Sequence, residues 1–411
     1  PMEGDRHEDP IHQAFFEKVQ RTESRSQGHN QLPERRDAEN PGDRKVEIAK
    51  WYRNRCQRGG KSACSHHGGW RGKAKTGDIR TKQNLQTGTV ICHANRAGVD
   101  GGGLMMDAQP FPEFSWSWTR SQVFLNCKRW YFHAYYSSWG GWRREASNLS
   151  KHAYRLKRLV TLDQLFGISV HNQIHRMIDE SQKMTVEEFT ASVRKALNRA
   201  FWDSKYKREE WYEQPSNINM LHEMYYDGEI PEQQIEEYRE RITVIANHLL
   251  SSQTFKDIFD RKDKIRLVSS ERFRVFELDG VKVWVVMDLV YQDLESGKFV
   301  VVDFKTGRPS SGDPVQLILY SLFLKEAFDI TSLDQMELRN EYLAIGKHAS
   351  FTPRHSDHEY VKSLIRTSVK EMKTYLRVPE QNVPLDMERF EQTKNRAICR
   401  RCAFQELCDT G

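Results

Sequence analysis

Two ionisable residues stand two positions apart at the end of an apolar stretch, in the segment FVVVDFKTGRP of residues 299–309. The β-branched run before them is typical of a buried strand. Side chains two apart in a strand point to the same face, so Asp303 and Lys305 are predicted to share one rim of a sheet. Because both residue types are seldom buried unless they are paired or used, this rim is a candidate for chemistry.

A second carboxylate stands among apolar residues in VWVVMDLVY, where Asp288 is predicted to lie within the preceding strand. A short turn between the two strands would bring Asp288 beside Asp303. Taken alone, either aspartate is explained about equally well by a functional role and by a structural role as a turn or capping residue. Two adjacent carboxylates repel each other, and Mg²⁺ removes that cost because it prefers hard oxygen ligands. The pattern therefore indicates a divalent-metal centre in which Lys305 holds a water or stabilises a phosphate.

Two further polar residues, Gln316 and Tyr320, stand four apart on the helix predicted after this strand. They lie on one face of that helix, about one turn apart. Near the helix N-terminus they would point back at the strand ends, where the positive end of the helix dipole favours an anion. Taken alone, the pair would be an ordinary helix surface.

The order of these residues resembles the PD-(D/E)XK nuclease superfamily, and within it the nuclease domain of the RecB/AddB type. That family has an early His, an Asp in a strand, Asp-x-Lys and Gln-x-x-x-Tyr. The early histidine is found in GISVHNQI, which matches the family's Gly-x-x-x-His-x-x-apolar form at Gly167, His171 and Ile174. His175 competes for the position, and the spacing from Gly167 favours His171. The resemblance runs from about residue 114 to residue 408.

The resemblance implies Mg²⁺- or Mn²⁺-dependent hydrolysis of a DNA phosphodiester, as an exonuclease in repair or recombination. It implies His171, Asp288 and Asp303 as metal ligands, together with the backbone carbonyl of Phe304. The family commonly has a glycine where this chain has Val285, and relatives often have a glutamate where Glu271 stands. The implied catalytic residues are Asp288, Asp303, Lys305, Gln316 and Tyr320.

Three cysteines lie close together in CRRCAFQELC, as Cys399-x2-Cys402-x5-Cys408. Three unrelated thiols are the simpler interpretation, but such clusters more often bind metal. The fourth ligand would be Cys127, and spacing alone leaves zinc open. The layout also resembles AddB-type and CRISPR-associated iron–sulfur nucleases, which implies a [4Fe–4S] cluster joining the N-terminal helix to the C-terminal tail.

The elements that must position these residues follow from periodicity. A first helix is predicted from near Thr119 or Ser121, and a second one extends through Ile178. A third helical region is predicted over 185–226, with Trp202 and Trp211 in the core, and a further helix begins at Pro231. Strands are predicted over 272–278, 281–291 and 299–305, with a hairpin at residues 279–280. Asp313 is predicted to cap a helix that begins at Pro314, followed by a fourth strand in LRNEYLAIG and a helix from Asp357.

This order of helices, strands, helix, strand and helix predicts an α+β fold, with a restriction-endonuclease-like core of a small mixed sheet flanked by helices. One nuclease domain is predicted over 106–411, with a helical insertion at about 180–260 and the cysteine tail. The part before the sheet is predicted to be mostly helical.

Residues 1–105 differ in composition from the rest of the chain. They contain 19 Lys and Arg against 13 Asp and Glu, and 14 of the 24 glycines. Their apolar residues show no sustained period, which predicts a mostly disordered basic tail and makes Met106 a plausible start. Cysteines and histidines at 64–67 and 92–93 match no common zinc-finger spacing.

The remaining sequence signals narrow the function classes. No apolar run approaches a membrane span and no secretory pattern is present, so a cytoplasmic protein is expected. No GxxxxGK[ST] loop occurs, so a helicase partner would be a separate chain. The alternatives are a non-catalytic DNA-binding scaffold of the same fold and an RNA-processing nuclease. Aromatic residues at 116, 118, 130 and 131 would stack bases or, more simply, fill the core.

Overall fold

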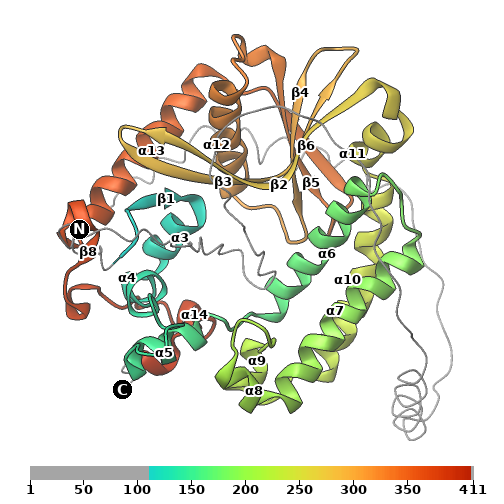
Figure 1. Ribbon diagram of the computed structural model, residues 1–411. Coiled ribbons are helices and arrows are strands. Elements are labelled where there is room, and N and C mark those ends of the chain that lie inside the picture. The colour runs from blue at the N-terminus through green and yellow to red at the C-terminus, as the bar shows by residue number, and fades with distance from the viewer. Residues whose placement is uncertain (1–110, 409–411) are drawn as a thin grey trace, which may run out of the picture.

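The computed structural model describes residues 111–408, apart from the side chains of residues 270–273 (Figure 1). The predicted α+β class is confirmed, because a mixed sheet lies between two groups of helices. The predicted disordered tail over 1–105, with its possible zinc residues, lies outside the described residues. The helices are α3 (Trp118–Asn126), α4 (Lys128–Phe132), α5 (Asn148–Leu156), α6 (Leu162–Asp179), α7 (Val186–Tyr206), α8 (Arg208–Glu213), α9 (His222–Tyr226), α10 (Glu232–Leu250), α11 (Gln253–Phe255), α12 (Gly312–Ala327), α13 (His355–Lys373) and α14 (Arg396–Cys399).

The strands are β1 (Ser115–Ser117), β2 (Ile265–Leu278), β3 (Val281–Asp293), β4 (Phe299–Lys305), β5 (Met336–Tyr342), β6 (Lys347–Phe351), β7 (Leu376–Val378) and β8 (Val383–Pro384). The main sheet has the order β1-β3-β4-β5-β6, and β2 pairs with β3. Strands β2, β3 and β4 form the predicted antiparallel meander. Strand β4 runs parallel to β5, with α12 as the crossover between them. Strands β1 and β6 were not predicted.

The turn between β2 and β3 follows its sequence closely. Asp279 and Gly280 have φ angles of 50° and 76°, the left-handed conformation that a two-residue hairpin of this kind requires. Asp and Gly tolerate this conformation better than other residues do. The pairing of Leu278 with Val281 then fixes the register of the whole hairpin.

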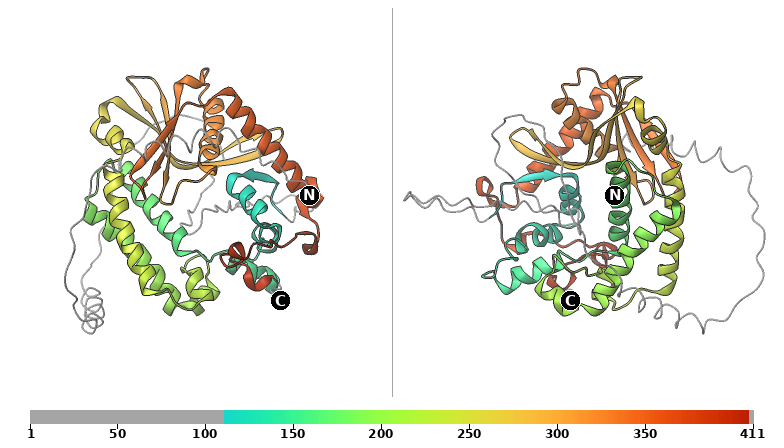
Figure 2. Two further views of the ribbon diagram at one scale, coloured as in Figure 1. Left: turned by 180° about the vertical axis from the view of Figure 1, so that it is seen from behind. Right: turned by 45° about the vertical axis from the view of Figure 1, so that its right-hand side comes forward.

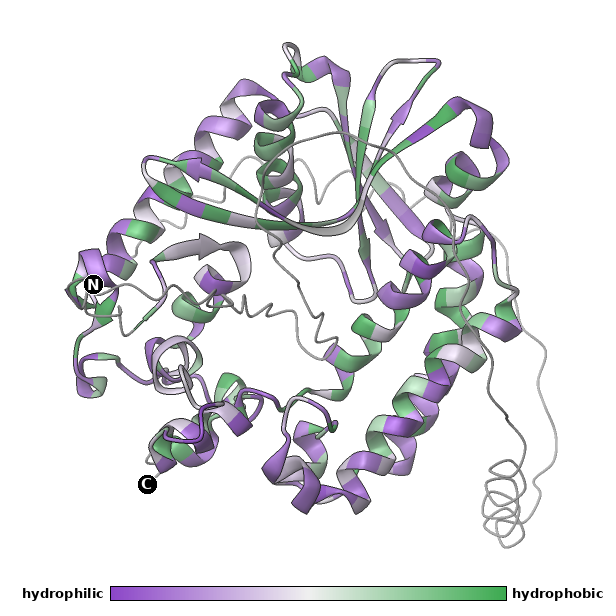
Figure 3. Ribbon diagram, viewed as in Figure 1, coloured by the Kyte–Doolittle hydropathy of each residue, from purple (hydrophilic) through white to green (hydrophobic). Residues whose placement is uncertain are grey.

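Alternate residues of β4 face two different hydrophobic cores. Val301 packs with α12 and α13 on one face of the sheet. Val300 and Val302 pack on the other face with α6, α7 and α10. In Figure 3, α12 is largely hydrophobic, whereas α13 alternates with polar residues because only one of its faces is covered. The sheet is thus covered on both faces, which explains why its central strands have nearly continuous apolar sequences.

Helix α12 begins differently from the prediction. Its N-cap is Ser311, and Asp313 lies within the first turn. The carboxylate of Asp313 accepts hydrogen bonds from the backbone N–H and the hydroxyl of Ser310, at 2.8 and 2.7 Å. Asp313 therefore supports the loop before the helix instead of capping it, and it is left free to face the strand ends.

The long helices α7 and α10 cover α6, in the region predicted as a helical insertion. Trp211 is fully buried there, as predicted. The prediction for Trp202 is wrong, because its side chain is 51% exposed. It stands on the face of α7 opposite the buried Val193 and Ala200, so the helical period places it in solvent.

The aromatic segment near residue 116 fills the core, as the simpler interpretation predicts. Trp116 and Tyr131 are fully buried, and Trp118 and Trp130 are partly buried against the same cores. Phe390, from the C-terminal part, stacks on Tyr131 and lies 4.8 Å from the ring of Phe132. The beginning and the end of the described chain therefore share one core, and both views in Figure 2 show them side by side.

The helices within residues 111–408 include none with the length and hydrophobicity that a membrane span requires.

Candidate active site

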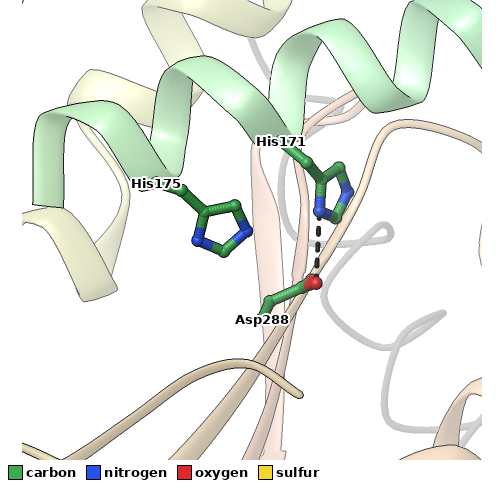
Figure 4. A group of neighbouring side chains, drawn as sticks. All are labelled: His171, His175 and Asp288. Atoms are coloured by element: carbon green, nitrogen blue, oxygen red, sulfur yellow. Dashed lines mark ion pairs between the residues drawn. The ribbon is translucent and has the colours of Figure 1, made fainter. Parts of the chain in front are cut away.

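The first predicted pair of site residues comes from α6 and β3. Nδ1 of His171 lies 3.2 Å from Oδ1 of Asp288, and Figure 4 shows the ring pointing at the carboxylate. The other carboxylate oxygen of Asp288 accepts a hydrogen bond from the backbone N–H of Phe304, at 2.8 Å. The side chain is thereby held from two sides, by a helix and by the adjacent strand.

The two aspartates lie opposite each other in the antiparallel pair of β3 and β4. The β3–β4 ladder ends at the pair Leu289 and Val302, and Asp288 and Asp303 are the next residue on each strand. Both residues are buried, since Asp288 is 9% exposed and Asp303 is 4% exposed. Sequence spacing had predicted this juxtaposition, and the register provides it.

Lys305 connects the strand end to α12. Its ammonium lies 2.7 Å from Oδ2 of Asp303 and donates a 2.9 Å hydrogen bond to Oε1 of Gln316. The amide of Gln316 in turn donates to the hydroxyl of Tyr320, one turn further along the helix. The pair that looked like ordinary helix surface therefore faces the sheet and extends the network begun by Asp303.

Two residues of this network had no motif in the sequence. Asp313 lies 3.6 Å from the Lys305 ammonium, and the hydroxyl of Tyr342 donates a 3.1 Å hydrogen bond to Asp313. Tyr342 is the β5 neighbour of Lys305 in the parallel pair. The only sequence signal for Asp313 was its position before a helix, which indicated a cap instead of a second partner for the lysine.

Burial and neighbouring charges set the pKa values in the site. Burial opposes the charge on His171, but Asp288 outweighs it and raises the pKa of His171 to about 9. Burial also opposes the charge on Asp288, yet the histidine holds the pKa of Asp288 below its usual range. For Asp303, burial and the nearby Asp288 together outweigh Lys305, so its pKa is raised. Asp303 is thus the carboxylate whose charge is opposed most by its buried surroundings.

The competing histidine also reaches this site. Atoms of His171, His175 and Asp288 that can bind a metal all lie within 4.8 Å of one another, and no other such group of three or more occurs among residues 111–408. Both histidines project from one face of α6 toward the strand (Figure 4). His171 is the closer partner of Asp288 in the structure, in agreement with the choice made from the spacing to Gly167.

The donor set fits a hard divalent cation. Two buried carboxylates and an imidazole converge, and burial raises the pKa of Asp303 although the Lys305 ammonium lies 2.7 Å from it. Mg²⁺ and Mn²⁺ bind such oxygen-rich sites, and a cation would remove the repulsion between the two aspartates. The backbone of Phe304 contributes its N–H to Asp288. Its carbonyl stays a predicted ligand, and the side chain of Glu271 lies outside the described residues.

The four predicted cysteine ligands also come together. Burial raises the pKa of the Cys402 thiol to about 12, and the other three cysteines, Cys408, Cys127 and Cys399, each add to this rise electrostatically. Backbone N–H groups of Trp130 and Phe404 donate to the sulfurs of Cys127 and Cys402, both at 3.4 Å. The four cysteines, from the beginning and the end of the described chain, therefore lie near one another.

Residues 115–409 match the model of the PD-(D/E)XK nuclease superfamily, a segment that contains both the candidate active site and the four cysteines. A search of the curated proteins finds no match.

Proposed function

Because the chain belongs to the PD-(D/E)XK nuclease superfamily, we propose that it is a divalent-metal-dependent nuclease that hydrolyses phosphodiester bonds in DNA. The observation that carries this proposal is the convergence of Asp288, Asp303 and Lys305 where the end of β4 meets the middle of β3. A scaffold protein that only kept the fold would gain nothing from burying two carboxylates side by side, since that arrangement costs stability unless a cation is bound.

His171, Asp288 and Asp303 would hold the cation, with the carbonyl of Phe304 as a further ligand. When bound, the cation would polarise the scissile phosphate and offset the negative charge that develops on it. Its binding requires a neutral imidazole, so His171 must release the proton that Asp288 stabilises in this structure. Affinity for the metal is therefore expected to rise with pH.

Lys305 would address the phosphate or the attacking water. It remains charged, because Asp303 and Asp313 outweigh the effect of burial and raise its pKa. Gln316 accepts one hydrogen bond from the ammonium and holds Tyr320 through its own amide, which restricts the orientation of Lys305. Preorganised charge of this kind is a large contribution to catalysis in sites that exclude water.

The test is cleavage of labelled DNA with Mg²⁺, with Mn²⁺ and with EDTA. Asp303→Asn and Lys305→Ala should each lower the rate at least about a hundredfold, because removing even an indirect partner of a metal site commonly costs 10–100-fold. Asp329→Asn, on an exposed turn, removes the same charge elsewhere and should leave the rate unchanged. Wild-type cleavage in both site variants, with native circular dichroism, would overturn the assignment.

The finer identity that we propose is a RecB/AddB-like exonuclease of repair or recombination. It is supported by the chain order of the motif residues and by the cysteine layout. Digestion of linear but not circular single-stranded DNA is the expected result. A helicase acting as a separate chain and a cytoplasmic location stay predictions, which co-purification and fractionation would test.

We also propose that the four cysteines hold a [4Fe–4S] cluster. The proposal is supported by the layout of one early cysteine and a Cys-x2-Cys-x5-Cys tail, and by the electrostatic effect of Cys127, Cys399 and Cys408 on the Cys402 thiol. Zinc is the alternative metal for the same four thiolates. Protein purified without oxygen should be brown with about four irons per chain. One zinc per colourless chain would replace the cluster and leave the nuclease proposal standing.

A further inference from the structure

The last turns of α7 carry two large aromatic side chains in solvent. Trp202 and Tyr206 are 51% and 57% exposed, and their ring centroids lie 4.3 Å apart. Aromatic residues of this size contribute strongly to a core when they are buried, so two adjacent exposed rings are an unusual feature. They form a continuous aromatic surface one helical turn long.

Cations surround this pair. Lys195 and Arg199 precede Trp202 by seven and three positions, which places them on the same face of α7, and both are exposed. The ammonium of Lys205 lies 5.5 Å from the ring centre of Tyr206. The acidic residue of these turns, Asp203, is buried and lies 3.8 Å from the exposed Arg199. The outward face of these turns therefore combines aromatic rings with positive charge.

This face lies a moderate distance from the candidate active site. Helices α6 and α7 pack against each other and are joined by residues 180–185. At 1.5 Å per residue, His171 stands about 12 Å from the end of α6 at that junction, and Trp202 about 24 Å from the start of α7. Along the helix axes, the positions of the two residues thus differ by about 12 Å, and the axes of two packed helices lie a further about 8–10 Å apart.

We propose that this face of α7 binds single-stranded DNA, a specification that rests on the proposed nuclease function. Unpaired bases stack on Trp202 and Tyr206, while Lys195, Arg199 and Lys205 contact the phosphates. Stacking on aromatic side chains is available only to bases outside a duplex, and it is tolerant of sequence. Positive charge complements the phosphates, which adds affinity that depends on salt.

The experiment measures binding of fluorescein-labelled 20-mers by anisotropy in EDTA, so that no cleavage occurs. The double variant Trp202→Ala/Tyr206→Ala should weaken binding of the single strand by about tenfold or more and leave binding of the blunt duplex nearly unchanged. Lys195→Ala/Arg199→Ala should reduce the salt dependence by about 1.4 in log–log slope, for two lost contacts. Phe328→Ala, an exposed aromatic on another element, is the control and should bind as wild type.

An unchanged single-strand affinity in the aromatic variant would overturn the proposal, as would an equal loss for the duplex. Hydrolysis of the small substrate bis(p-nitrophenyl) phosphate reports the metal centre alone and should be unaffected by these variants. Wild type that binds the single strand but fails to hydrolyse any substrate would reject the nuclease function and not this surface.

A second inference concerns Asn340 on β5, and this inference rests on a separate observation. Asn340 is the partner of Asp303 in the parallel pair of β4 and β5, so both side chains lie on the face toward α12. It is completely buried, and neither its amide nitrogen nor its oxygen has a hydrogen-bond partner within the described residues. A buried amide without partners is unfavourable, so its position beside Asp303 calls for a ligand.

We infer that Asn340 is a positioning residue of the proposed metal centre, which holds the Asp303 carboxylate through a bound water. Carboxylate ligands of metals are commonly oriented by such outer partners. Because Asn340 is fully buried, bulk solvent does not supply its hydrogen bonds. Leu338 and Met336 on the same face are apolar and offer no hydrogen-bond partner.

Asn340→Leu separates this role from simple packing. Without metal, the variant should melt at or above the wild-type temperature, because it replaces an unsatisfied amide by an apolar group of similar size. At Mn²⁺ concentrations that saturate the wild type, the metal-dependent rise in Tm should be smaller in the variant. The apparent Mn²⁺ affinity of the variant should be about 10–100-fold lower than that of the wild type. The control is Thr190→Val on α7, which removes a different buried polar group, a hydroxyl without a hydrogen-bond partner, and should keep full Mn²⁺ affinity. Wild-type Mn²⁺ affinity in Asn340→Leu would overturn the inference.

Discussion

The charged residues of the candidate site form ion pairs with one another. Asp288 has His171 as its cation, and Lys305 is shared between Asp303 and Asp313. Burial opposes the charge on both carboxylates. It outweighs Lys305 at Asp303, whose pKa is raised, whereas His171 outweighs it at Asp288, whose pKa is lowered. This asymmetry marks Asp303 as the position where an added cation would relieve most strain.

Lys157 provides a pH-dependent test at the residue scale. Burial lowers the pKa of Lys157 to about 7, and the nearby Arg158 and Arg120 add to this effect. Its ammonium donates to the carbonyl of Ala134 and has no carboxylate partner among the described residues. The unfolded chain keeps the usual lysine pKa of about 10.4, so it binds a proton between pH 7 and 10 that the folded protein releases.

Stability should therefore rise with pH across this window, and the cost of the buried charge is fully present below pH 7. Lys157→Met should melt at a higher temperature than wild type at pH 6.5. The difference should shrink toward pH 10. Thermal unfolding of both proteins at pH 6.5, 8 and 9.5 measures it, and a difference independent of pH would contradict the lowered pKa.

At the scale of elements, a buried ion pair ties the π-helical turn of Lys256–Asp260 to the sheet. Arg339 on β5 lies 2.9 Å from Asp257 in that turn, and the hydroxyl of Tyr291 on β3 donates to the same carboxylate at 2.6 Å. Burial would raise the pKa of Asp257, but the hydrogen bonds from Tyr291 and Arg339 hold it below its usual range. The turn leads directly into β2, so this contact fixes where the meander begins.

Removing one partner of that pair should cost more than removing both. Arg339→Met should lower the free energy of unfolding by up to about 3–5 kcal/mol, because the buried carboxylate of Asp257 then has only the more distant Arg261, at 3.5 Å, as a cation. The double variant Arg339→Met/Asp257→Asn should recover part of this loss. Urea unfolding of the two variants and wild type measures the effect, and equal destabilisation in both would show that the charge of Asp257 is not the cause.

At the scale of the whole molecule, the two ends of the described chain are joined without a metal as well. The backbone N–H of Arg129 donates to the carbonyl of Glu391, and its side chain donates to the carbonyl of Phe390. The cysteine tail also contacts α9, where the hydroxyl of Tyr226 donates to the carbonyl of Ala403 at 2.8 Å. The tail is thus docked by its own contacts, and a cluster would strengthen that docking.

Cys127→Ser should loosen the tail without unfolding the core. The variant should lose bound metal, and residues 390–408 should exchange amide hydrogens faster and be cleaved sooner by protease, because one of four ligands between the ends is gone. Cys92→Ser, outside the predicted ligand set, should keep both the metal and the protection. Full metal content in Cys127→Ser would remove Cys127 from the ligand set.

The domain boundary is a prediction of the same scale. Deleting residues 1–105 should leave the melting temperature and cleavage of short DNA nearly unchanged, because no core pattern lies there. Weaker DNA binding at low salt is compatible with this expectation, since a basic segment adds phosphate contacts. A fall in Tm of about 5 °C or more would show that the segment is part of the folded domain.

Local sequence determined the elements and most of the site. The turn at Asp279–Gly280 and the alternation in residues 299–305 depend on φ preferences and a two-residue period, which act within a few residues. The spacing of Asp288 and Asp303 was sufficient to predict that they lie side by side, because the meander that joins them is itself local. The place of His171 was predicted from the family resemblance.

Tertiary structure decided what depends on packing between distant segments. Asp313 has the sequence context of a cap, and only the approach of Lys305 and Tyr342 makes it part of the site. Trp202 has the composition of a core residue, but the face of α7 that α6 and α10 cover leaves it in solvent. Asn340 became notable only when the parallel pairing of β4 and β5 placed it beside Asp303. Such contacts join residues tens of positions apart, and their pairing is set by the whole fold, which no short-range pattern encodes.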